Sequence, residues 1–225
     1  MRTEWINQDA LARPADAGVS RRGFIKAGAV ATSGLVLGFF MPGANKFANA
    51  AAGPKATHAP NAFLRIAPDN SITVMVNRLE FGQGVHTALP MLMAEELDAD
   101  WSQVRGELAP AGDAFKDPGM GMQMTGGSGS VANSFMQYRE IGAKARAMLV
   151  AAAAQQWNVQ PGQCRTENGV VIGPGGQKAS YGSLADAAMK QPVPATVTLK
   201  DPKNFRFIGK PLPRPDLPEP PKRIE

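Results

Sequence analysis

This chain of 225 residues is most constrained by a strand that stops at a pair of glycines and gives way almost at once to an apolar helix. Gly82-Gln83-Gly84 ends the strand, and residues 87–97 predict the helix. Pro90 then lies in the first turn of the helix, where a missing N–H is harmless. Two glycines around one glutamine predict that the backbone comes close to another group at this point.

The strand is the second half of a predicted hairpin. Apolar residues lead into a turn at residues 68–70, and apolar residues with a period of two follow it. They are Phe63, Leu64 and Ile66 before the turn and Ile72, Val74 and Val76 after it. After the helix we expect a short connector at residues 101–104, a strand near 105–110 and a loop over 111–124.

A second glycine-rich turn, TGGSGS at residues 125–130, precedes the longest predicted helix. Apolar residues recur at spacings of three and four over residues 132–157, which predicts one buried stripe. They are Phe135, Tyr138, Ile141, Ala145, Met148, Leu149 and Ala152, and we interpret them as core rather than as a cofactor site.

The last third of the chain predicts small elements. A hairpin is expected around Asn168-Gly169, and Ser183 is placed to start a short helix. Its inner face consists of Leu184, Ala187 and Ala188. Prolines crowd the sequence from residue 191 onward, which predicts an extended tail. Short strands and helices without βαβ regularity favour an α+β fold, with short mixed or antiparallel strands and two or three packed helices.

Charge and cysteine content argue against several functions. The net charge is +5, but the first fifty residues hold six basic against three acidic residues, and both signs are interspersed over the rest. Without a basic stripe and interleaved aromatic residues, nucleic-acid binding is not expected. Cys164 is the single cysteine, which excludes a disulfide or an iron–sulfur ligand set within this chain. His58 and His86 are too few for an ordinary zinc site, and we interpret His86 as a polar helix-start residue.

Residues 1–50 have the pattern of a twin-arginine signal peptide. SRRGFIK at residues 20–26 is followed by an apolar run over 27–41 and by Ala48-Asn49-Ala50, a small-residue cleavage pattern. A membrane-spanning helix is the alternative, but it needs roughly 20 apolar residues. This run is shorter and rich in glycine and alanine. We therefore expect export by the twin-arginine pathway and a periplasmic mature protein.

Both glycine-rich turns lead into a helix N-terminus, where free amides favour an anion. Glycine removes the Cβ that would keep a ligand away, and Gln83 adds a donor and an acceptor. The candidate ligand-binding residues are Gly82, Gln83, Gly84, Thr125, Gly126, Gly127, Ser128, Gly129 and Ser130. An ordinary tight turn is the alternative at both places, and neither turn matches a Rossmann or Walker pattern.

Three segments, at residues 80–105, 124–159 and 199–216, together resemble one family. They are similar to the N-terminal part of the molybdopterin-binding large subunit of bacterial molybdenum hydroxylases in the xanthine oxidase family. Isoquinoline 1-oxidoreductase beta subunits and membrane-associated aldehyde dehydrogenase large subunits are examples. The resemblance implies a partial molybdopterin-binding domain over 51–200, before a proline-rich tail over 201–225. It implies that residues 82–84 help to bind molybdopterin cytosine dinucleotide and that residues 125–130 lie against its pterin and phosphates.

The reaction implied by the resemblance is hydroxylation of an aldehyde or an N-heterocycle at molybdenum. Electrons would leave through [2Fe–2S] clusters on a small partner subunit, with a cytochrome c-type protein as a further acceptor. The family's glutamate base has no counterpart in this chain, since Gly106-Glu107-Leu108 lies in a predicted strand. We therefore expect a truncated or split large subunit that is inactive without its C-terminal half.

Two other classes of function stay open on the sequence alone. One is an exported remnant or binding module that keeps the fold but binds no cofactor. The other is a hydrolase that uses a serine near Gly127 together with His86. Residues 126–130 lack the Gly-x-Ser-x-Gly spacing and the paired acid of a nucleophile elbow, which argues against the hydrolase.

Overall fold

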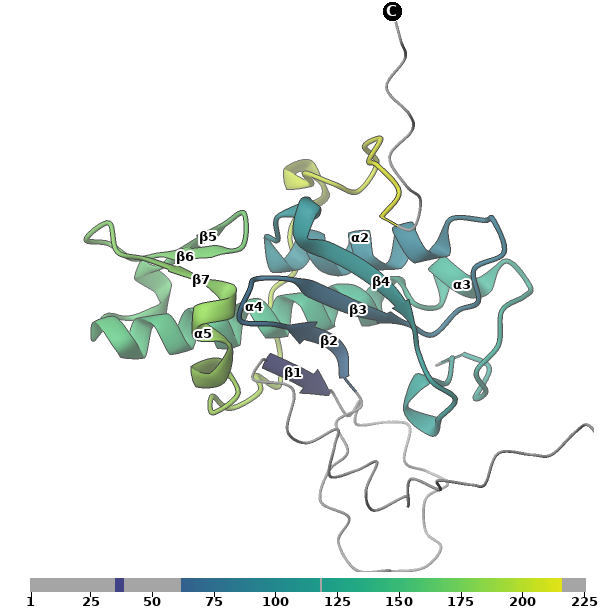
Figure 1. Ribbon diagram of the computed structural model, residues 1–225, viewed down its shortest axis with the longest axis horizontal. Helices are drawn as coiled ribbons and strands as arrows, with labels where there is room; N and C mark the ends of the chain where they lie inside the picture. Colours follow the sequence, from purple (N-terminus) through teal and green to yellow (C-terminus); the bar gives the residue numbers. More distant parts are fainter. Residues whose placement is uncertain (1–34, 39–61, 118, 216–225) are drawn as a thin grey trace, which may run out of the picture. The chain divides into compact units, whose positions relative to one another are not determined.

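Alternating apolar residues build the larger of two sheets. The computed structural model describes residues 35–38, 62–117 and 119–215. Within them, four strands form one sheet in the order β1 (Leu35–Gly38), β2 (Ala62–Ile66), β3 (Ile72–Val76) and β4 (Val104–Leu108) (Figure 1). The first two pairings are antiparallel, and β3 pairs with β4 in parallel. All the apolar residues of the predicted hairpin are buried, so the hairpin is confirmed.

Strand β1 is the one part of the predicted signal peptide that the structure describes. It lies within the apolar run 27–41 and pairs with β2, Leu35 opposite Ile66. The paired arginines and the cleavage pattern fall outside the described residues, so the signal peptide stays a prediction. Among the described helices, none has the length and apolar character needed to cross a bilayer.

Helix α2 (Val85–Leu97) connects the parallel strands β3 and β4 and forms a single βαβ unit. The helix begins two residues earlier than predicted, so Pro90 lies in its second turn, and the prediction that Pro90 occupies the first turn was wrong. Proline has no N–H for the carbonyl of His86 one turn earlier. A Cβ on Gly106 of β4 would lie 2.8 Å from that carbonyl oxygen. Only glycine therefore lets β4 pack this closely on the proline-bearing turn.

The long predicted helix is divided into α3 (Gly129–Ala132) and α4 (Phe135–Trp157). The prediction of one continuous helix over 132–157 was therefore wrong at its start. Ser134 lies at the break, is fully buried and accepts a hydrogen bond at 2.9 Å from the guanidinium of Arg78. A long-range polar contact thus competes with the local helical pattern.

The predicted stripe on α4 is core. Its residues from Tyr138 to Ala152 are buried, and Phe135 packs partly buried against them. Helix α4 lies beside α2, and a Cβ on Gly142 would overlap the carbonyl oxygen of Met93. The two helix backbones therefore approach each other closely, and a larger residue at this position would force them apart.

A second, smaller sheet follows α4. It contains β5 (Arg165–Glu167), β6 (Val170–Ile172) and β7 (Lys178–Ser180), all antiparallel. Asn168 and Gly169 join β5 to β6 with φ of 47° and 73°, which confirms the predicted two-residue hairpin. Strand β7 has no signal in the sequence, because three residues are too short to show a period.

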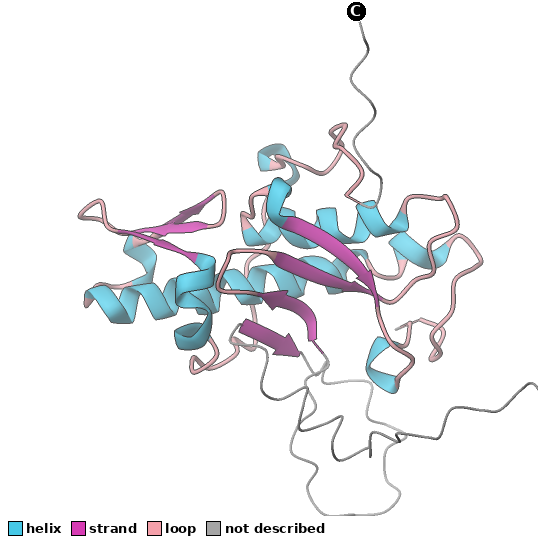
Figure 2. Cartoon of the chain, in the orientation of Figure 1, coloured by secondary structure: helices cyan, strands magenta, loops and turns pink. Residues whose placement is uncertain are grey.

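Helix α5 (Tyr181–Ala188) begins two residues before the predicted start. Its N-cap is Ser180, whose hydroxyl accepts from the N–H of Ser183, so the prediction that Ser183 starts the helix was wrong. The remaining helical segments are short 3-10 turns that Figure 2 shows among long loops. They are η3 (Trp101–Gln103), η4 (Asp113–Phe115), η5 (Pro161–Gln163) and η6 (Pro202–Asn204). Helices packed with one mixed sheet and one antiparallel sheet confirm the α+β fold.

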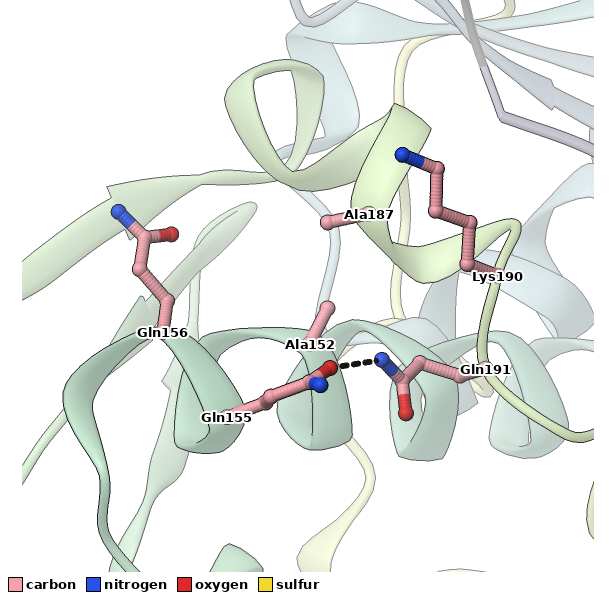
Figure 3. Close-up of a pocket in the computed structure, with 6 residues that line it drawn as sticks. All are labelled: Ala152, Gln155, Gln156, Ala187, Lys190 and Gln191. Carbon is pink, nitrogen blue, oxygen red and sulfur yellow. Dashed lines mark hydrogen bonds between the residues drawn. The ribbon is translucent and has the colours of Figure 1, made fainter.

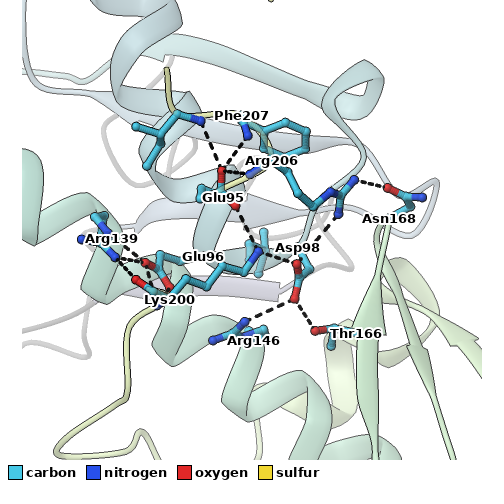
Figure 4. Close-up of polar contacts among 12 residues, drawn as sticks. Glu95, Glu96, Asp98, Arg139, Arg146, Thr166, Asn168, Lys200, Arg206 and Phe207 are labelled. Atoms are coloured by element: carbon cyan, nitrogen blue, oxygen red, sulfur yellow. Dashed lines mark hydrogen bonds and ion pairs between the residues drawn. The ribbon is translucent and has the colours of Figure 1, made fainter. Parts of the chain in front are cut away.

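We call residues 200–214 the strap. Its residues 200–208 lie against the C-terminal end of α2 (Figure 4), whereas Arg214 lies near Glu80 at the other end of that helix. Glu95 is fully buried, and its carboxylate accepts the backbone N–H groups of Arg206, Phe207 and Ile208 at 2.9, 2.6 and 3.2 Å. The ammonium of Lys200 lies 3.1 Å from the same carboxylate. The extended tail is therefore fastened to the core by charge-assisted hydrogen bonds.

Two neighbouring acids complete this attachment. Glu96, also fully buried, pairs with Arg139 at 2.6 Å and accepts the backbone N–H of Lys200. Asp98 ends α2 and accepts from Lys200, Arg146 and the hydroxyl of Thr166. Burial alone would raise the pKa values of Glu95 and Asp98, but their hydrogen-bond donors and cations hold both pKa values below the ordinary range.

We expect Glu95→Ala to lower the free energy of unfolding by about 3–5 kcal/mol, because it leaves the strap's N–H groups without an acceptor and removes one partner of a buried pair. Denaturant unfolding followed by circular dichroism measures the change. Glu107→Ala is the matched control, since Glu107 is half exposed and pairs only with Arg65 at 3.3 Å. The control should lose no more than about 1 kcal/mol. Equal losses in both variants would contradict the anchoring role of Glu95.

Candidate functional site

The two glycine-rich turns predicted from the sequence lie side by side. The N–H of Leu79 donates to the hydroxyl oxygen of Thr125 at 2.7 Å, and the guanidinium of Arg78 donates to the carbonyl of Met124 at 2.8 Å. We call residues 82–84 the first turn and residues 125–130 the second turn. The first turn follows the carboxyl end of β3, which is the edge where ligands bind in sheets containing βαβ units.

A buried ion pair holds the two turns together. Arg78 and Asp117 are 1% and 2% exposed, and their side chains lie 2.6 Å apart. Asp117 also accepts from the amide of Asn133 and from the N–H groups of Gly119 and Met120. Burial by itself would raise the pKa of Asp117, but Asn133, Gly119 and Arg78 hold that pKa below its usual value.

The sequence did not predict this pair, because residues 111–124 show little periodicity and predict only a loop. The signal was present in the sequence, since an aspartate that precedes proline and glycine commonly bonds the backbone two residues on, as Asp117 does with the N–H of Gly119. The pairing partner, 39 positions earlier, could not be read from local pattern.

A second buried contact, made by Tyr138 of α4, holds the end of β3 next to these turns. The hydroxyl of Tyr138 donates to the carbonyl of Met75 at 2.9 Å and accepts the N–H of Asn77 at 3.2 Å. The Asn77 amide in turn donates to the carbonyl of Phe115. Burial raises the pKa of Tyr138 above its ordinary value, so the phenol stays neutral and donates. The end of β3 and the loop at Phe115 are therefore attached to α4.

The first turn has its polar groups engaged within its own loop. The Glu80 carboxylate accepts the N–H groups of Gly82, Gly84 and His86 at 2.8, 3.0 and 2.9 Å. The amide of Gln83 accepts from Phe81 and donates to the carbonyl of Leu79. Gly82 and Gly84 have φ of 106° and 83°, so glycine is needed at both positions for backbone conformation. Glu80 thus occupies the N–H groups of Gly82 and Gly84, and Leu79 accepts from the Gln83 side chain. The backbone N–H of Gln83 is the donor of this turn that has no acceptor among the described residues.

The second turn is open. Among the described residues, no acceptor takes the N–H groups of Gly126, Gly127 or Ser128, and no partner bonds the hydroxyls of Ser128 or Ser130. Residues 126–128 are exposed to solvent. A Cβ on Gly127, which has φ of 63°, would meet nothing within 4 Å. These groups form a donor set that an anionic or polar ligand can reach.

The other members of the second turn have structural roles. The Thr125 hydroxyl oxygen is occupied by Leu79, although its hydrogen stays available to donate. A Cβ on Gly129 would lie 2.9 Å from the side-chain amide of Asn133, the residue that bonds Asp117. Gly129 therefore keeps the turn tight against the buried ion pair.

Apolar side chains surround both turns. Six large apolar residues on or beside these loops expose between 39% and 70% of their surface, although they adjoin the best-packed polar contacts of the region. They are Leu79, Phe81, Met120, Met122, Val131 and Met136. Ligand sites commonly combine such apolar walls with a few polar groups.

The hydrolase alternative finds no support in the arrangement. The Nε2 atom of His86 is buried and has no hydrogen-bond partner among the described residues, so it is not hydrogen-bonded to Ser128. Within residues 35–38, 62–117 and 119–215, no cluster of three or more His, Cys, Asp or Glu side chains is arranged to hold a metal ion.

A pocket of about 540 Å³ lies elsewhere, between the C-terminal half of α4 and the end of α5 (Figure 3). It is lined by Ala152, Gln155, Gln156, Ala187, Lys190 and Gln191. Ala152 is about 25 Å along α4 from Phe135, at 1.5 Å per residue. The pocket is therefore separate from the glycine-rich turns, and its lining offers a single cation.

We expect Asp117→Asn to lower the free energy of unfolding by about 3–5 kcal/mol at neutral pH, because Arg78 is left buried without a counter-ion. Because the folded-state pKa of Asp117 lies below its ordinary 3.8, its stabilisation is fully present above pH 3.8 and is lost as the pH falls through the lowered value. Unfolding measured across this range should show a steeper acid loss for the wild type than for the variant.

The control for this prediction is Asp113→Asn, since the Asp113 side chain is 94% exposed and pairs only with Lys116. Its stability and acid profile should follow the wild type. An Asp117→Asn protein as stable as this control would show that the two loops are held by other contacts.

Comparison with known proteins places these features in a family. A family model described as a molybdopterin cofactor-binding domain matches residues 12–211. The beta chain of isoquinoline 1-oxidoreductase from Brevundimonas diminuta is 32% identical over 236 residues, covering 89% of this chain and 30% of that protein. The membrane-bound aldehyde dehydrogenase (pyrroloquinoline-quinone) of Gluconacetobacter polyoxogenes is 32% identical, covering 88% and 26%. The B subunit of nicotinate dehydrogenase from Pseudomonas putida is 29% identical, covering 69% and 13%. The chain spans less than a third of the length of each relative.

Proposed function

Because the chain belongs to the molybdopterin cofactor-binding domain family, we propose that it forms one wall of a molybdopterin site and that the second turn makes the polar contacts. The observation that carries this proposal is the open donor set of the second turn, beside the first turn and surrounded by apolar side chains. The set consists of the N–H groups of Gly126, Gly127 and Ser128 and the hydroxyls of Ser128 and Ser130. Both turns precede helices, but Glu80 takes the N–H groups of Gly82 and Gly84 in the first, whereas the second has three consecutive N–H groups without an acceptor among the described residues.

The residues present fit such a ligand at the second turn. The N–H groups of Gly126, Gly127 and Ser128 would donate to phosphate or pterin oxygens, as consecutive backbone amides do in anion sites. The hydroxyls of Ser128 and Ser130 can donate or accept at a heterocycle edge. The exposed methionines and Phe81 would cover the ligand's ring faces and exclude water.

A bound molybdopterin would supply the redox-active metal, and this chain's own residues would hold and orient the cofactor. The backbone of the second turn has no side chain at Gly127 to keep a phosphate away. The buried Arg78–Asp117 pair limits movement of the turn. The contribution that we assign to this chain is binding and orientation of the cofactor.

We propose further that the cofactor is the cytosine dinucleotide form and that the complete enzyme oxidises aldehydes or N-heterocycles. The names of the relatives, which refer to isoquinoline, aldehyde and nicotinate, support this substrate class. Two relatives are named as subunits, which supports a partner carrying [2Fe–2S] clusters and a further electron acceptor of the cytochrome c type. The greater length of all three relatives supports a further segment that completes the large subunit.

The cofactor proposal is tested by Gly127→Val in the full chain, produced in cells that make the cofactor together with the remaining large-subunit segment. We expect the wild type to retain molybdenum and cytidine monophosphate, detected by mass spectrometry after acid release, and the variant to retain at least tenfold less of both, because about 1.4 kcal/mol of lost contact is tenfold in affinity.

Gly176→Val is the matched control for this experiment. Gly176 also has a positive φ of 80° and open space at its Cβ position, but it lies in the turn between β6 and β7. The two variants share the same backbone strain, and only the first blocks the second turn. Cofactor loss in both variants, or in neither, would overturn the assignment.

Export is the remaining proposal, and the paired arginines of the N-terminal segment support it. The substitutions Arg21→Lys and Arg22→Lys keep the charge but remove the planar guanidinium groups that bind bidentate partners. We expect the doubly substituted precursor to accumulate in the cytoplasm, measured by cell fractionation and immunoblotting. Arg2→Lys with Arg13→Lys is the control and should leave export unchanged. Normal export of the first variant would contradict a twin-arginine route.

A further inference from the structure

The first turn contains a ligand that belongs to the chain itself. Three backbone N–H groups converge on the carboxylate of Glu80, two on one oxygen and one on the other. Convergent amides at the start of a helix are the arrangement by which proteins hold phosphate and carboxylate ions. In this turn the anion is supplied by a side chain only two to six positions away in sequence.

The side chain of Gln83 is also engaged within this loop, whereas its backbone N–H has no acceptor among the described residues. The two polar atoms of the Gln83 side chain both bond the backbone of their own loop, at Phe81 and Leu79. Arg214 of the strap lies 3.7 Å from Glu80 and adds a positive charge beside it. The Glu80 side chain is 16% exposed, so little of it is left in contact with solvent.

An outside anion faces two obstacles at this turn. Glu80 is tethered next to the amides, so its effective concentration there is on the order of millimolar or more, without loss of translational freedom. A phosphate that approached the loop with Glu80 in place would meet a like charge in a partly buried setting, where charge repulsion is only weakly screened. The free N–H groups of the second turn present neither obstacle.

We infer that Glu80 is the resident anion of the first turn, that this turn takes no phosphate from outside, and that Glu80 acts as a positioning residue for the second turn. The connection is direct, because the loop that Glu80 shapes includes Leu79, whose N–H bonds Thr125. This differs from the role that the family resemblance implies for residues 82–84. The inference holds whether or not the second turn binds the cofactor, because it concerns a carboxylate of this chain.

The decisive measurement is a titration of the full chain with inorganic pyrophosphate, followed by amide NMR after selective isotope labelling of glycine. In the wild type we expect the signals of Gly82 and Gly84 to stay in place. In Glu80→Ala we expect both signals to shift in a saturable manner, because their N–H groups have lost their acceptor. Pyrophosphate-dependent shifts of Gly82 and Gly84 in the wild type would overturn the inference, and this result needs no variant to fold.

Chemical rescue separates an anion site from a general packing role. Acetate replaces the carboxylate that Glu80→Ala removes, so it should raise the melting temperature of this variant relative to equal concentrations of chloride. Glu107→Ala, which removes a half-exposed carboxylate bonded only to Arg65, should show no acetate effect. If Glu80→Ala responds to neither acetate nor pyrophosphate, the carboxylate was not filling an anion site. Should that variant fail to fold, Glu80→Gln and the wild-type titration replace it.

The outcome is distinguishable from that of the cofactor experiment. Loss of molybdenum in Gly127→Val tests the second turn, whereas pyrophosphate shifts at Gly82 and Gly84 test the first. A protein in which both turns respond to pyrophosphate would keep the proposed function and rule out Glu80 as the resident anion. A protein in which neither wild-type turn responds would keep the role of Glu80 and count against the second turn as a phosphate site.

Discussion

A buried guanidinium has to be surrounded by acceptors, and Arg78 meets this need with two residues of the loop after β4 and one residue at the start of α4. It pairs with Asp117 from the loop after β4, with Ser134 at the start of α4 and with the carbonyl of Met124. Asp117 and Met124 come from a loop with little regular structure, and Ser134 lies at the break between α3 and α4. The two glycine-rich turns lie side by side because they flank these contacts, so the geometry of the site follows from one desolvated charge.

Much of the fold could be predicted from local pattern. Alternation of apolar residues identified the β2–β3 hairpin, and a three-and-four spacing identified the buried face of α4. The errors lie where a distant group decides the outcome. Pro90 lies in the second turn of α2 because the helix begins at Val85, where the Glu80 carboxylate accepts the N–H of His86. Ser134 lies at a break in the long predicted helix because it is an acceptor for the buried Arg78. Strap attachment through Glu95 was beyond any local rule.

The candidate site was predictable in position but not in detail. Glycine spacing located both turns, and the structure brings them together. That rule treats the amides at a helix start as available to a ligand, and it takes no account of a carboxylate that folds back on them. Glu80, with glycines two and four positions later, is the signal in the sequence that was passed over. The second turn shows the opposite case, since Gly126, Gly127 and Ser128 have no such neighbour among the described residues.

The strap also sets an order of events during protein synthesis. Glu95 is synthesised 111 and 112 residues before Arg206 and Phe207. The N–H groups of these two residues offset the cost of burying the Glu95 carboxylate. Until those residues have been made, α2 carries two acids that would have to enter the core without most of their partners, which is costly. Synthesis of the strap is therefore the step that allows the C-terminal end of α2 to become buried. In a nascent chain paused before residue 200, this end of the helix would stay exposed to chaperones and proteases.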